Sequence, residues 1–592
     1  MKKCKFLVCF LLVLSNLLLL NCSLVVSNAT VEAQQPFSDV PKTSYAYNAV
    51  NQLRSLGITN GYGNNTFGYG KTLTRGEFIT FLVRIMGWEQ ISPAVGSFSD
   101  NKDPKKFYYK PIETALANGA IAADTDKIRP DDAITREEGA IIMVNTLGYK
   151  NLAEQISYFN KPFDDVTKNI GYITIVRDIG IFNGEGAGFN PTGSLLREQA
   201  AAILIRLVNT MNNKITDLNA FYAISSSSQH EKIQNLTSVC FGWSKLSYDE
   251  SAKNIVLNTS RYSYSYNEYY LPTGFTSRLD EAKAAGIPAM LMVQSTQDSK
   301  MISPETGNKI GVPEYILKDP KVYSKVISDI AAALKSTTLG SETGSFDGVV
   351  IDIEGLRGEE LKKCFNDFLR ELKAALDRDN KKLYVAVQPL MNVKRSATSF
   401  NGYDFKTIGE LADRVILMAH DYDAKKLTSS EMASGYSLTP LTPLEDVYYA
   451  LETITDRNTG VADKKSKIML QINFSWNVWR KQDGRIINSV PDHFNLESFL
   501  KLLESNTNIS YNYNEKYENP YIKYIDESNG TENIVWYENT KSVMKKIELA
   551  KLFGIQGISL WRLGNIPDYN GTNTSIQGMD IWQNILGELE KN

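Results

Sequence analysis

The segment FDGVVIDIEG, residues 346–355, carries three acidic side chains in an otherwise apolar run. Alternate residues of a strand share a face, so Asp352 and Glu354 point the same way, about 6 to 7 Å apart, and Asp347 points the other way. Burial beside a second carboxylate raises a carboxyl pKa, and a glutamic acid protonated near neutral pH can protonate a glycosidic oxygen. Alternatively, both carboxylates only cap a strand beside a lysine or arginine.

Eight short apolar runs follow residue 214 and alternate with amphipathic segments, which indicates repeated βα units. One helix is expected at 360–376, where Leu361, Phe365, Leu369 and Leu372 form a stripe. Eight units over about 380 residues fit a (β/α)8 TIM barrel with its active site at the carboxyl-terminal rim. A doubly wound sheet is the alternative, but no glycine-rich phosphate loop follows the first run. The runs begin at Ala220, Ser238, Pro288, Gly348, Lys382, Arg414, Lys467 and Gly557.

The run DGVVIDIE resembles the glycoside hydrolase family 18 signature Asp-Gly-x-Asp/Asn-x-Asp-x-Glu. The resemblance implies that Glu354 is the acid/base and that Asp352 orients the substrate N-acetyl group, whose carbonyl oxygen attacks C1 with net retention. Because the substrate supplies the nucleophile, no cofactor is implied. Val350 stands where the family usually has Asp or Asn, so Asp352 loses a hydrogen-bonding partner in the barrel interior.

Two later strand ends add residues to this resemblance. MAHDY, residues 418–422, is similar to the family motif Met-x-Tyr-Asp, with His420 in place of the tyrosine. His420 can donate a hydrogen bond to the acetamide, with a charge that depends on pH. SLWRLG, residues 559–564, ends the eighth run, where the family has a tryptophan under the scissile sugar, and the resemblance implies this role for Trp561. An indole suits the apolar face of a pyranose. The substrate-binding residues implied are Asp347, Met418, His420, Asp421, Tyr422 and Trp561.

With residues 535–564, these segments resemble the spore-cortex-lytic branch of family 18, which cleaves at N-acetylglucosamine in peptidoglycan. Two tyrosine clusters lie where they would line a substrate cleft, although packing of a β-rich insertion explains them as well. They are Tyr262, Tyr264, Tyr266, Tyr269 and Tyr270, and Tyr511, Tyr513, Tyr517, Tyr521 and Tyr524.

The first third of the chain contains an internal repeat. FSDV, FSDN and FDDV open its copies at Phe37, Phe98 and Phe163, and an arginine recurs every 61 residues, at Arg75, Arg136 and Arg197. In the first two copies Thr precedes the arginine and Glu follows two residues after it, which predicts a capping box. Leu196 and Gln199 replace these residues in the third copy, so its cap is expected to be weaker.

The repeat resembles the S-layer homology (SLH) module, whose signature has the form Thr-Arg-Ala-Glu. The resemblance implies an all-α, three-pronged domain that binds anionic, typically pyruvylated, polysaccharide of a Gram-positive-type cell wall, with arginine on the acid group. A guanidinium suits a carboxylate, and helix N-termini attract anions. Arg75 and Arg136 fit best, and Arg197 departs in its surroundings. Alternatively, the arginines only lie at the start of capped helices and bind no anion.

The N-terminus predicts export. Three lysines precede an apolar run at residues 6–20, and Val-Glu-Ala at 31–33 is a cleavage pattern. A retained anchor is the alternative, but the run is short for a bilayer span, and Asn21 argues against a lipid on Cys22. No later run is long enough to cross a membrane. Removing residues 1–33 takes away three lysines and one glutamate, which moves the formal charge from −3 to −5.

This charge argues against a nucleic-acid partner. Only Cys240 and Cys364 remain after cleavage, so no disulfide scaffold is expected, and three scattered histidines make a zinc site improbable. The expected parts are a signal peptide at 1–33, repeats at 34–90, 95–152 and 160–213, and a barrel at 214–592 with an α+β insertion before its last strand. The predicted function is a secreted, wall-tethered glycosidase acting on peptidoglycan. The alternatives are a wall-bound lectin or S-layer structural protein, or a chitin or N-glycan substrate.

Overall fold

The computed structural model describes residues 36–156, 162–262, 267–392, 394, 400–420, 422, 426–505, 508–569, 576 and 578–590. The predicted signal peptide, Tyr264, Tyr266 and Asp421 lie outside these residues. The chain divides into two compact units, residues 1–71 with 196–202 and residues 72–195 with 203–592. In the described part of the chain, no helix is both long and apolar enough to span a membrane.

Short helices form the repeat region, as the SLH resemblance implies. They are α1 (Tyr47–Ser55), α2 (Arg75–Ile85), α3 (Tyr109–Ala117), α4 (Arg136–Thr146), α5 (Lys150–Gln155), α6 (Ile170–Asp178) and α7 (Arg197–Met211). Thr74 and Thr135 cap α2 and α4, and Glu77 and Glu138 complete both capping boxes, as predicted. At α7, Leu196 has no side-chain oxygen, and only the return bond from its N–H to Gln199 is present, at 3.0 Å.

Equivalent residues of the three repeats bond to one another in the larger unit. The N–H of Leu73 donates to the carbonyl of Leu195 at 2.8 Å, that of Leu195 to Ile134 at 2.9 Å, and that of Ile134 to Leu73 at 3.0 Å. Each residue lies two positions before a repeat arginine. The three bonds therefore close a triangle that satisfies three buried backbone donors and acceptors.

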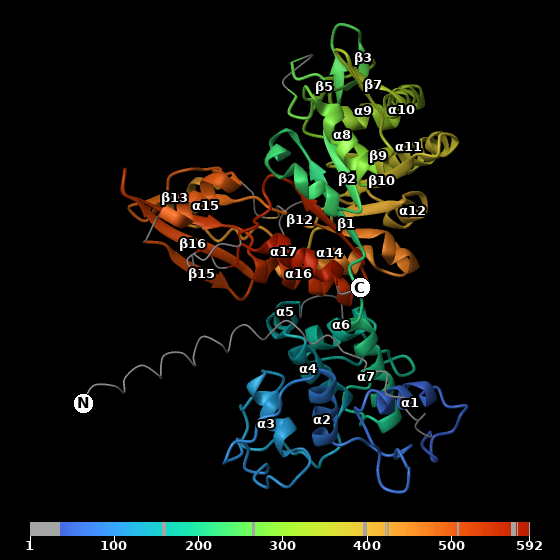
Figure 1. Cartoon of the computed structure of the whole chain (residues 1–592), viewed down its shortest axis with the longest axis vertical. Helices are drawn as coiled ribbons and strands as arrows, with labels where there is room; N and C mark the ends of the chain where they lie inside the picture. The colour runs from blue at the N-terminus through green and yellow to red at the C-terminus, as the bar shows by residue number, and fades with distance from the viewer. Residues whose placement is uncertain are drawn as a thin grey trace, which may run out of the picture. The chain divides into compact units, whose positions relative to one another are not determined.

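Eight parallel strands form a closed barrel, which confirms the predicted (β/α)8 fold (Figure 1). Seven neighbouring pairs run in the order β1-β18-β12-β11-β10-β9-β4-β2, and pairing of β1 with β2 closes the ring. An additional strand, β3 (Asn254–Asn258), lies antiparallel to β2. The barrel strands are β1 (Asp217–Tyr222), β2 (Ser238–Asp249), β4 (Ala289–Thr296), β9 (Gly348–Glu354), β10 (Lys382–Val387), β11 (Arg414–Leu417), β12 (Ile468–Asn473) and β18 (Gly557–Trp561).

The barrel interior is packed with side chains from alternate strand positions. Its fully buried members are Phe221, Cys240, Met290, Met292, Val350, Tyr384, Ala386, Ile416 and Met469, and Tyr269, Met418 and Trp561 pack against them. Val350 therefore identifies the inward face of β9. Asp352 and Glu354 continue that face towards the carboxyl end of the strand.

Amphipathic helices cover the outside of the strands, with α10, α11 and α12 along one side (Figure 1). The helix α11 (Glu359–Arg378) buries Phe365, Leu369 and Leu372 of the predicted stripe, and Leu361 is half-buried. The other covering helices include α8 (Phe275–Ala284), α9 (Val312–Lys318), α10 (Pro320–Lys335), α12 (Phe405–Leu411), α14 (Leu444–Ile454), α16 (Thr540–Leu552) and α17 (Ile581–Glu590).

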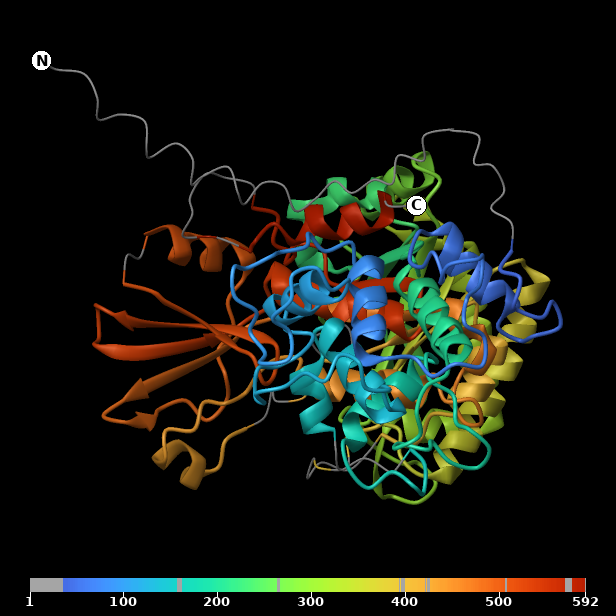
Figure 2. The same cartoon turned by 90° about the horizontal axis from the view of Figure 1, so that it is seen from below.

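The predicted α+β insertion lies between β12 and β18. Its antiparallel sheet has the order β14-β13-β17-β16-β15 and appears as a twisted layer of orange-red strands in Figure 2. Tyr521 and Tyr524 are partly buried in the apolar clusters of this insertion. The elements are β13 (Asn477–Gln482), β14 (Arg485–Ile486), α15 (Leu496–Ser505), β15 (Ser510–Asn514), β16 (Asn519–Asp526) and β17 (Thr531–Trp536).

Candidate active site

Two carboxyl groups lie on the inward face of β9, at its carboxyl end. Asp352 is 5% exposed, and Glu354, the last residue of the strand, is half-buried. Burial, and then the charge of Glu354, raise the pKa of Asp352 well above its usual range. One carboxyl group is thus enclosed and the next lies at the rim.

Asp352 Oδ1 is buried and has no hydrogen-bond partner among the described residues. On the neighbouring strand, Gln294 is in register with Asp352, and its Oε1 is likewise buried without a partner in the described part of the chain. Val350, where the signature has an acid or amide, is fully buried and offers no donor. The predicted loss of a partner for Asp352 agrees with this arrangement. Two buried acceptors at one level need a proton or a bound donor.

The chain turns after Glu354 and is held there by residues that follow β10 and β4. The N–H of Gly355 donates to Gln388 Oε1 at 2.6 Å, and Gln297 N–H donates to the Glu354 carbonyl at 3.1 Å. The hydroxyl of Tyr403 donates to the carbonyl of Ile353 at 2.8 Å. Burial, the charge of Glu354 and that of Asp352 raise the Tyr403 pKa well above its usual range. The backbone that carries both carboxyl groups is therefore fixed.

Met418, which directly follows β11, and Trp561, the last residue of β18, lie at the same end of the barrel. Both are half-buried against the apolar interior. The Trp561 ring centroid lies 5.1 Å from that of Phe221, and the peptide bond to Arg562 is cis. Part of the Trp561 indole therefore stays exposed at this end of the barrel.

His420 lies beyond β11 and contacts the neighbouring strand. Its Nε2 is 2.6 Å from Gln471 Oε1 on β12. Tyr422 is turned elsewhere, because its hydroxyl donates to the carbonyl of Asp446 in the first turn of α14, at 3.4 Å. The structure thus connects Tyr422 to a helix, and Asp421 lies outside the described residues.

Asp347 does not belong to this end of the barrel. It is exposed and precedes β9, and its carboxylate accepts the N–H of Ala289 at 2.9 Å. Glu354 lies seven positions after Asp347 along extended chain, which is about 23 Å. The expected role of Asp347 in substrate binding is therefore corrected, since the residue fixes the amino end of β4 against β9.

The comparison with known families decides what this barrel is. The model described as Glycosyl hydrolases family 18 matches residues 220–565. The chain belongs to this family. The S-layer homology domain model also matches residues 36–79, 98–140 and 162–201, so three SLH domains precede the family 18 domain.

Individual relatives share parts of this organisation. The cortical fragment-lytic enzyme of Bacillus subtilis (strain 168) is 23% identical over 285 residues, 46% of this chain and 57% of that protein. Exoglucanase XynX of Acetivibrio thermocellus is 31% identical over 184 residues, 30% of this chain and 16% of that protein. The spore cortex-lytic enzyme SleL of Bacillus cereus, a solved structure, has 18% identity and a TM-score of 0.45, over 64% of this chain and 75% of that one. The matched part of this chain thus covers little more than half of the cortical enzyme of B. subtilis and about a sixth of XynX.

The three SLH arginines are buried, with 4%, 5% and 2% of Arg75, Arg136 and Arg197 exposed. Arg75 donates to the carbonyl of Arg129 at 2.8 Å and pairs with Glu138 of the second repeat. Arg136 donates to carbonyls of the third repeat at 2.6 and 2.7 Å, and Arg197 to the Phe67 carbonyl of the first at 2.8 Å. These side chains join one repeat to the next, and their role in three matching anion pockets stays a prediction.

Several residues of the family 18 site were not predicted, whereas Tyr269 had been named in the first tyrosine cluster. Tyr269 packs against the barrel interior, and burial, Glu268, Asp352 and Glu354 raise its pKa. Gln294, Gln388 and Gln471 each stand at or just beyond the polar end of an apolar strand, a signal that could have indicated them. For Tyr403, in contrast, no pattern in its own segment gives a signal.

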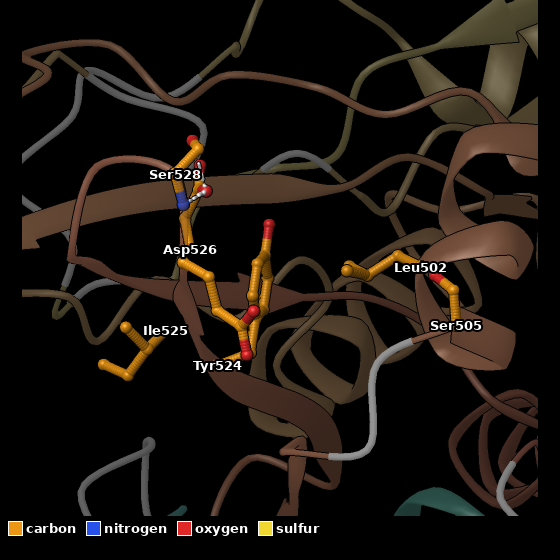
Figure 3. Close-up of a pocket in the computed structure, with 7 residues that line it drawn as sticks. Leu502, Ser505, Tyr524, Ile525, Asp526 and Ser528 are labelled. Atoms are coloured by element: carbon orange, nitrogen blue, oxygen red, sulfur yellow. Dashed lines mark hydrogen bonds between the residues drawn. The ribbon is translucent and has the colours of Figure 1, made fainter.

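Two further features lie apart from the family 18 site. An open hollow of about 430 Å³ on the insertion is lined by Leu502, Ser505, Tyr524, Ile525, Asp526, Glu527 and Ser528 (Figure 3). Tyr524 belongs to the second tyrosine cluster, and none of the residues implied by the family 18 signature lines the hollow. Among the described residues, no group of His, Cys, Asp and Glu is arranged to hold a metal ion.

Proposed function

We propose that this chain is a wall-bound glycosidase that cleaves β-linked N-acetylglucosamine glycans, with peptidoglycan as the substrate, by a retaining, substrate-assisted mechanism. The observation that carries the proposal is the enclosed Asp352, with Oδ1 unpartnered among the described residues, beside Glu354 at the rim. Family membership, and the name of the cortical fragment-lytic relative, support the choice of glycan.

In this mechanism Glu354 donates its proton to the glycosidic oxygen as the bond to C1 breaks. The acetamido carbonyl oxygen of the substrate attacks C1, and Asp352 accepts a hydrogen bond from the acetamido N–H and stabilises the positive charge of the ring that forms. The Glu354 carboxylate then takes a proton from the water that attacks C1. Trp561 lies under the sugar.

The SLH domains are proposed to hold the secreted protein on an anionic, pyruvylated wall polysaccharide of a Gram-positive-type bacterium. Their match to the SLH model supports wall attachment. Because the repeat arginines are occupied by acceptors of the chain itself, the anion is expected to meet other groups as well, such as backbone N–H groups at helix starts.

The test is hydrolysis of purified peptidoglycan, chitin oligomers and an N-glycoprotein, with products identified by mass spectrometry. Glu354→Gln is expected to lower the rate by a factor of about 10² to 10⁴. Glu359→Gln, at a side chain that is 81% exposed, is the control and retains activity. Equal release of reducing ends by the unaltered protein and Glu354→Gln would remove the catalytic claim.

A non-catalytic lectin or S-layer structural protein is the second candidate. The observation that favours it is Val350, which leaves Asp352 without the neighbour of the family signature. This candidate predicts glycan binding by the unaltered protein without any cleavage. Cleavage of chitin oligomers or the N-glycan, with peptidoglycan left intact, would instead change the substrate and keep the chemistry.

A further inference from the structure

A chain of hydrogen bonds crosses the barrel interior from His420 to the amino end of β2. The His420 ring lies 2.6 Å from Gln471 Oε1, and Gln471 Nε2 donates to Ser559 Oγ at 3.4 Å. Ser559 donates to Asn219 Oδ1 at 2.9 Å, and Asn219 Nδ2 donates to the carbonyl of Ser238 at 3.2 Å. Gln471, Ser559, Asn219 and Ser238 are 0–2% exposed, so water does not compete for these bonds.

The direction of this chain is fixed at its far end. A backbone carbonyl only accepts, so Asn219 must present its NH2 group to Ser238 and its oxygen to Ser559. Ser559 has a single proton and donates it to Asn219, so it accepts from Gln471. The reverse amide orientation would place two acceptors against each other in a dry interior, which is costly.

The consequence reaches the histidine. Since the NH2 group of Gln471 faces Ser559, its oxygen faces His420, and a contact of 2.6 Å requires a proton on Nε2. We propose that Gln471, Ser559 and Asn219 are positioning residues that hold His420 as the Nε2–H tautomer. Nε2 keeps its proton in both charge states of the ring, and only Nδ1 gains or loses one.

The Nε2–H tautomer limits how His420 can contact the substrate, a consequence that rests on the proposed function. The family tyrosine that His420 replaces donates through its hydroxyl, whereas His420 has committed Nε2–H to the barrel wall. Nε2–H is therefore unavailable to the acetamido group, so His420 cannot repeat the donation of the tyrosine hydroxyl through that nitrogen.

The experiment is NMR of the full chain with ring-13C histidine, because the Cδ2 chemical shift of a neutral imidazole distinguishes its two tautomers. The chain has three histidines, and His420→Gln identifies the signal. The unaltered protein is expected to show the Nε2–H tautomer alone. Gln471→Met removes the acceptor and Ser559→Ala frees the amide to rotate, so both are expected to populate the Nδ1–H tautomer.

Two matched variants complete the test. Gln471→Glu retains an acceptor and is expected to keep the Nε2–H tautomer. Ser244→Ala removes a buried barrel serine that is not part of this series of hydrogen bonds, because its hydroxyl donates to the Met292 carbonyl. This variant is expected to leave the His420 signal unchanged. In hydrolysis, Ser559→Ala is expected to lower kcat/KM about tenfold, the size of one lost hydrogen bond, with Ser244→Ala within twofold.

A dominant Nδ1–H tautomer in the unaltered protein would overturn the proposal. So would an unchanged tautomer in both Ser559→Ala and Gln471→Met. If Ser559→Ala does not fold, the contrast between Gln471→Met and Gln471→Glu decides. The NMR result does not depend on cleavage, so absence of hydrolysis would refute the proposed function and leave this inference standing.

Discussion

Asp352 on β9 and Gln294 on β4 are paired in register on neighbouring strands of the barrel. One side-chain oxygen of each has no hydrogen-bond donor within the described ranges. An ionised carboxylate is costly in such a place, because neither solvent nor a donor stabilises its charge. The protein therefore keeps a destabilising group at its candidate active site, and that group should affect stability in a pH-dependent way.

Asp352→Asn is expected to increase the free energy of unfolding at pH 7. The folded-state pKa of Asp352 is raised by burial and by Glu354, so stability falls as the pH rises above the unfolded value of about 3.9. Asparagine does not ionise, so the variant escapes this loss. Each unit of raised pKa corresponds to about 1.4 kcal/mol. Urea unfolding at several pH values, followed by tryptophan fluorescence, measures the difference.

The gain from Asp352→Asn should shrink towards zero at pH 4 and below, where aspartic acid is protonated in both states. Asp526→Asn is a control of opposite sign, because hydrogen bonds from Ser528 lower the pKa of Asp526. It should lose stability at neutral pH. A gain for Asp352→Asn that is equal at pH 4 and pH 7 would contradict this account.

Gly355→Ala is expected to destabilise the barrel and reduce activity together. Gly355 has φ +81°, and an added Cβ would lie 2.9 Å from Gln297 Cβ. The left-handed backbone alone costs about 1–2 kcal/mol for a residue with a side chain, and the close contact adds to it. Because Glu354 precedes this turn, any shift moves its carboxyl group. Unfolding in urea and hydrolysis rates measure the two effects.

Gly358→Ala is the matched control for this turn. Gly358 has φ +85°, but an added Cβ there meets no atom within 4 Å. With ψ 160°, Gly358 has a conformation almost confined to glycine, so the variant should lose stability through its backbone alone and keep its activity. Equal losses of activity in the two variants would show that the contact with Gln297 does not position Glu354.

The barrel could be predicted because its signals are local. Eight apolar runs were found as eight strands, and the period of two placed Asp352 and Glu354 on the face of Val350. The caps Thr74 and Thr135 were also correct, since a capping box lies within four residues. In each case the partner is close in sequence, so the pattern alone contains the information.

The remaining contacts depend on which distant segments become neighbours. The acceptors that Arg75 contacts lie 53 to 63 residues away in the sequence. The motif that indicates an anion site therefore fits equally well an arginine that is buried and links two repeats. The hydrogen bond from Ser559 to Asn219 spans 340 residues and exists only because β1 and β18 pair. The sequence predicted the strand ends but not which of them pair, so the hydrogen bonds that link Gln471, Ser559 and Asn219 were not predicted.

Lys546→Met is expected to cost about 3–5 kcal/mol of stability, the usual loss when one partner of a buried ion pair is removed. Lys546 and Glu538 side chains are 1% and 0% exposed, and Nζ lies 2.9 Å from Oε2. Asn519 also donates to Glu538, at 3.0 Å, so the insertion and α16 share this carboxylate. Urea unfolding measures the loss.

The double variant Glu538→Gln with Lys546→Met should recover much of that stability, because it leaves no buried charge without a counterion. Lys541→Met, at a side chain that is 56% exposed, is the control and should change stability by less than about 1 kcal/mol. A double variant no more stable than Lys546→Met would show that the charge of Glu538 is not the cause.

Arg75→Met should separate the two roles of the repeat arginines. Its guanidinium donates to the carbonyls of Ile128 and Arg129 and pairs with Glu138. Hydrogen bonds to charged groups contribute about 1.5–3 kcal/mol, so the variant should unfold at lower urea concentration. Burial tends to raise the pKa of Glu138, but the hydrogen bond from the Thr135 N–H and the charge of Arg75 outweigh burial, so the pKa of Glu138 is lowered. Losing Arg75 should therefore raise that pKa and reduce the stability that the ionised Glu138 provides above about pH 4.

Sedimentation with purified cell walls supplies the second measurement for Arg75→Met. If the arginine joins repeats, wall binding should weaken only under conditions where the variant has lost repeat structure, and Lys105→Met, at an exposed lysine of the second repeat, should match the unaltered protein in both assays. If Arg75→Met instead unfolds like the unaltered protein but no longer sediments with walls, its guanidinium meets the polysaccharide directly. The assignment of Arg75 to joining the repeats would then be wrong, because a buried side chain that links two repeats cannot be removed without a loss of stability.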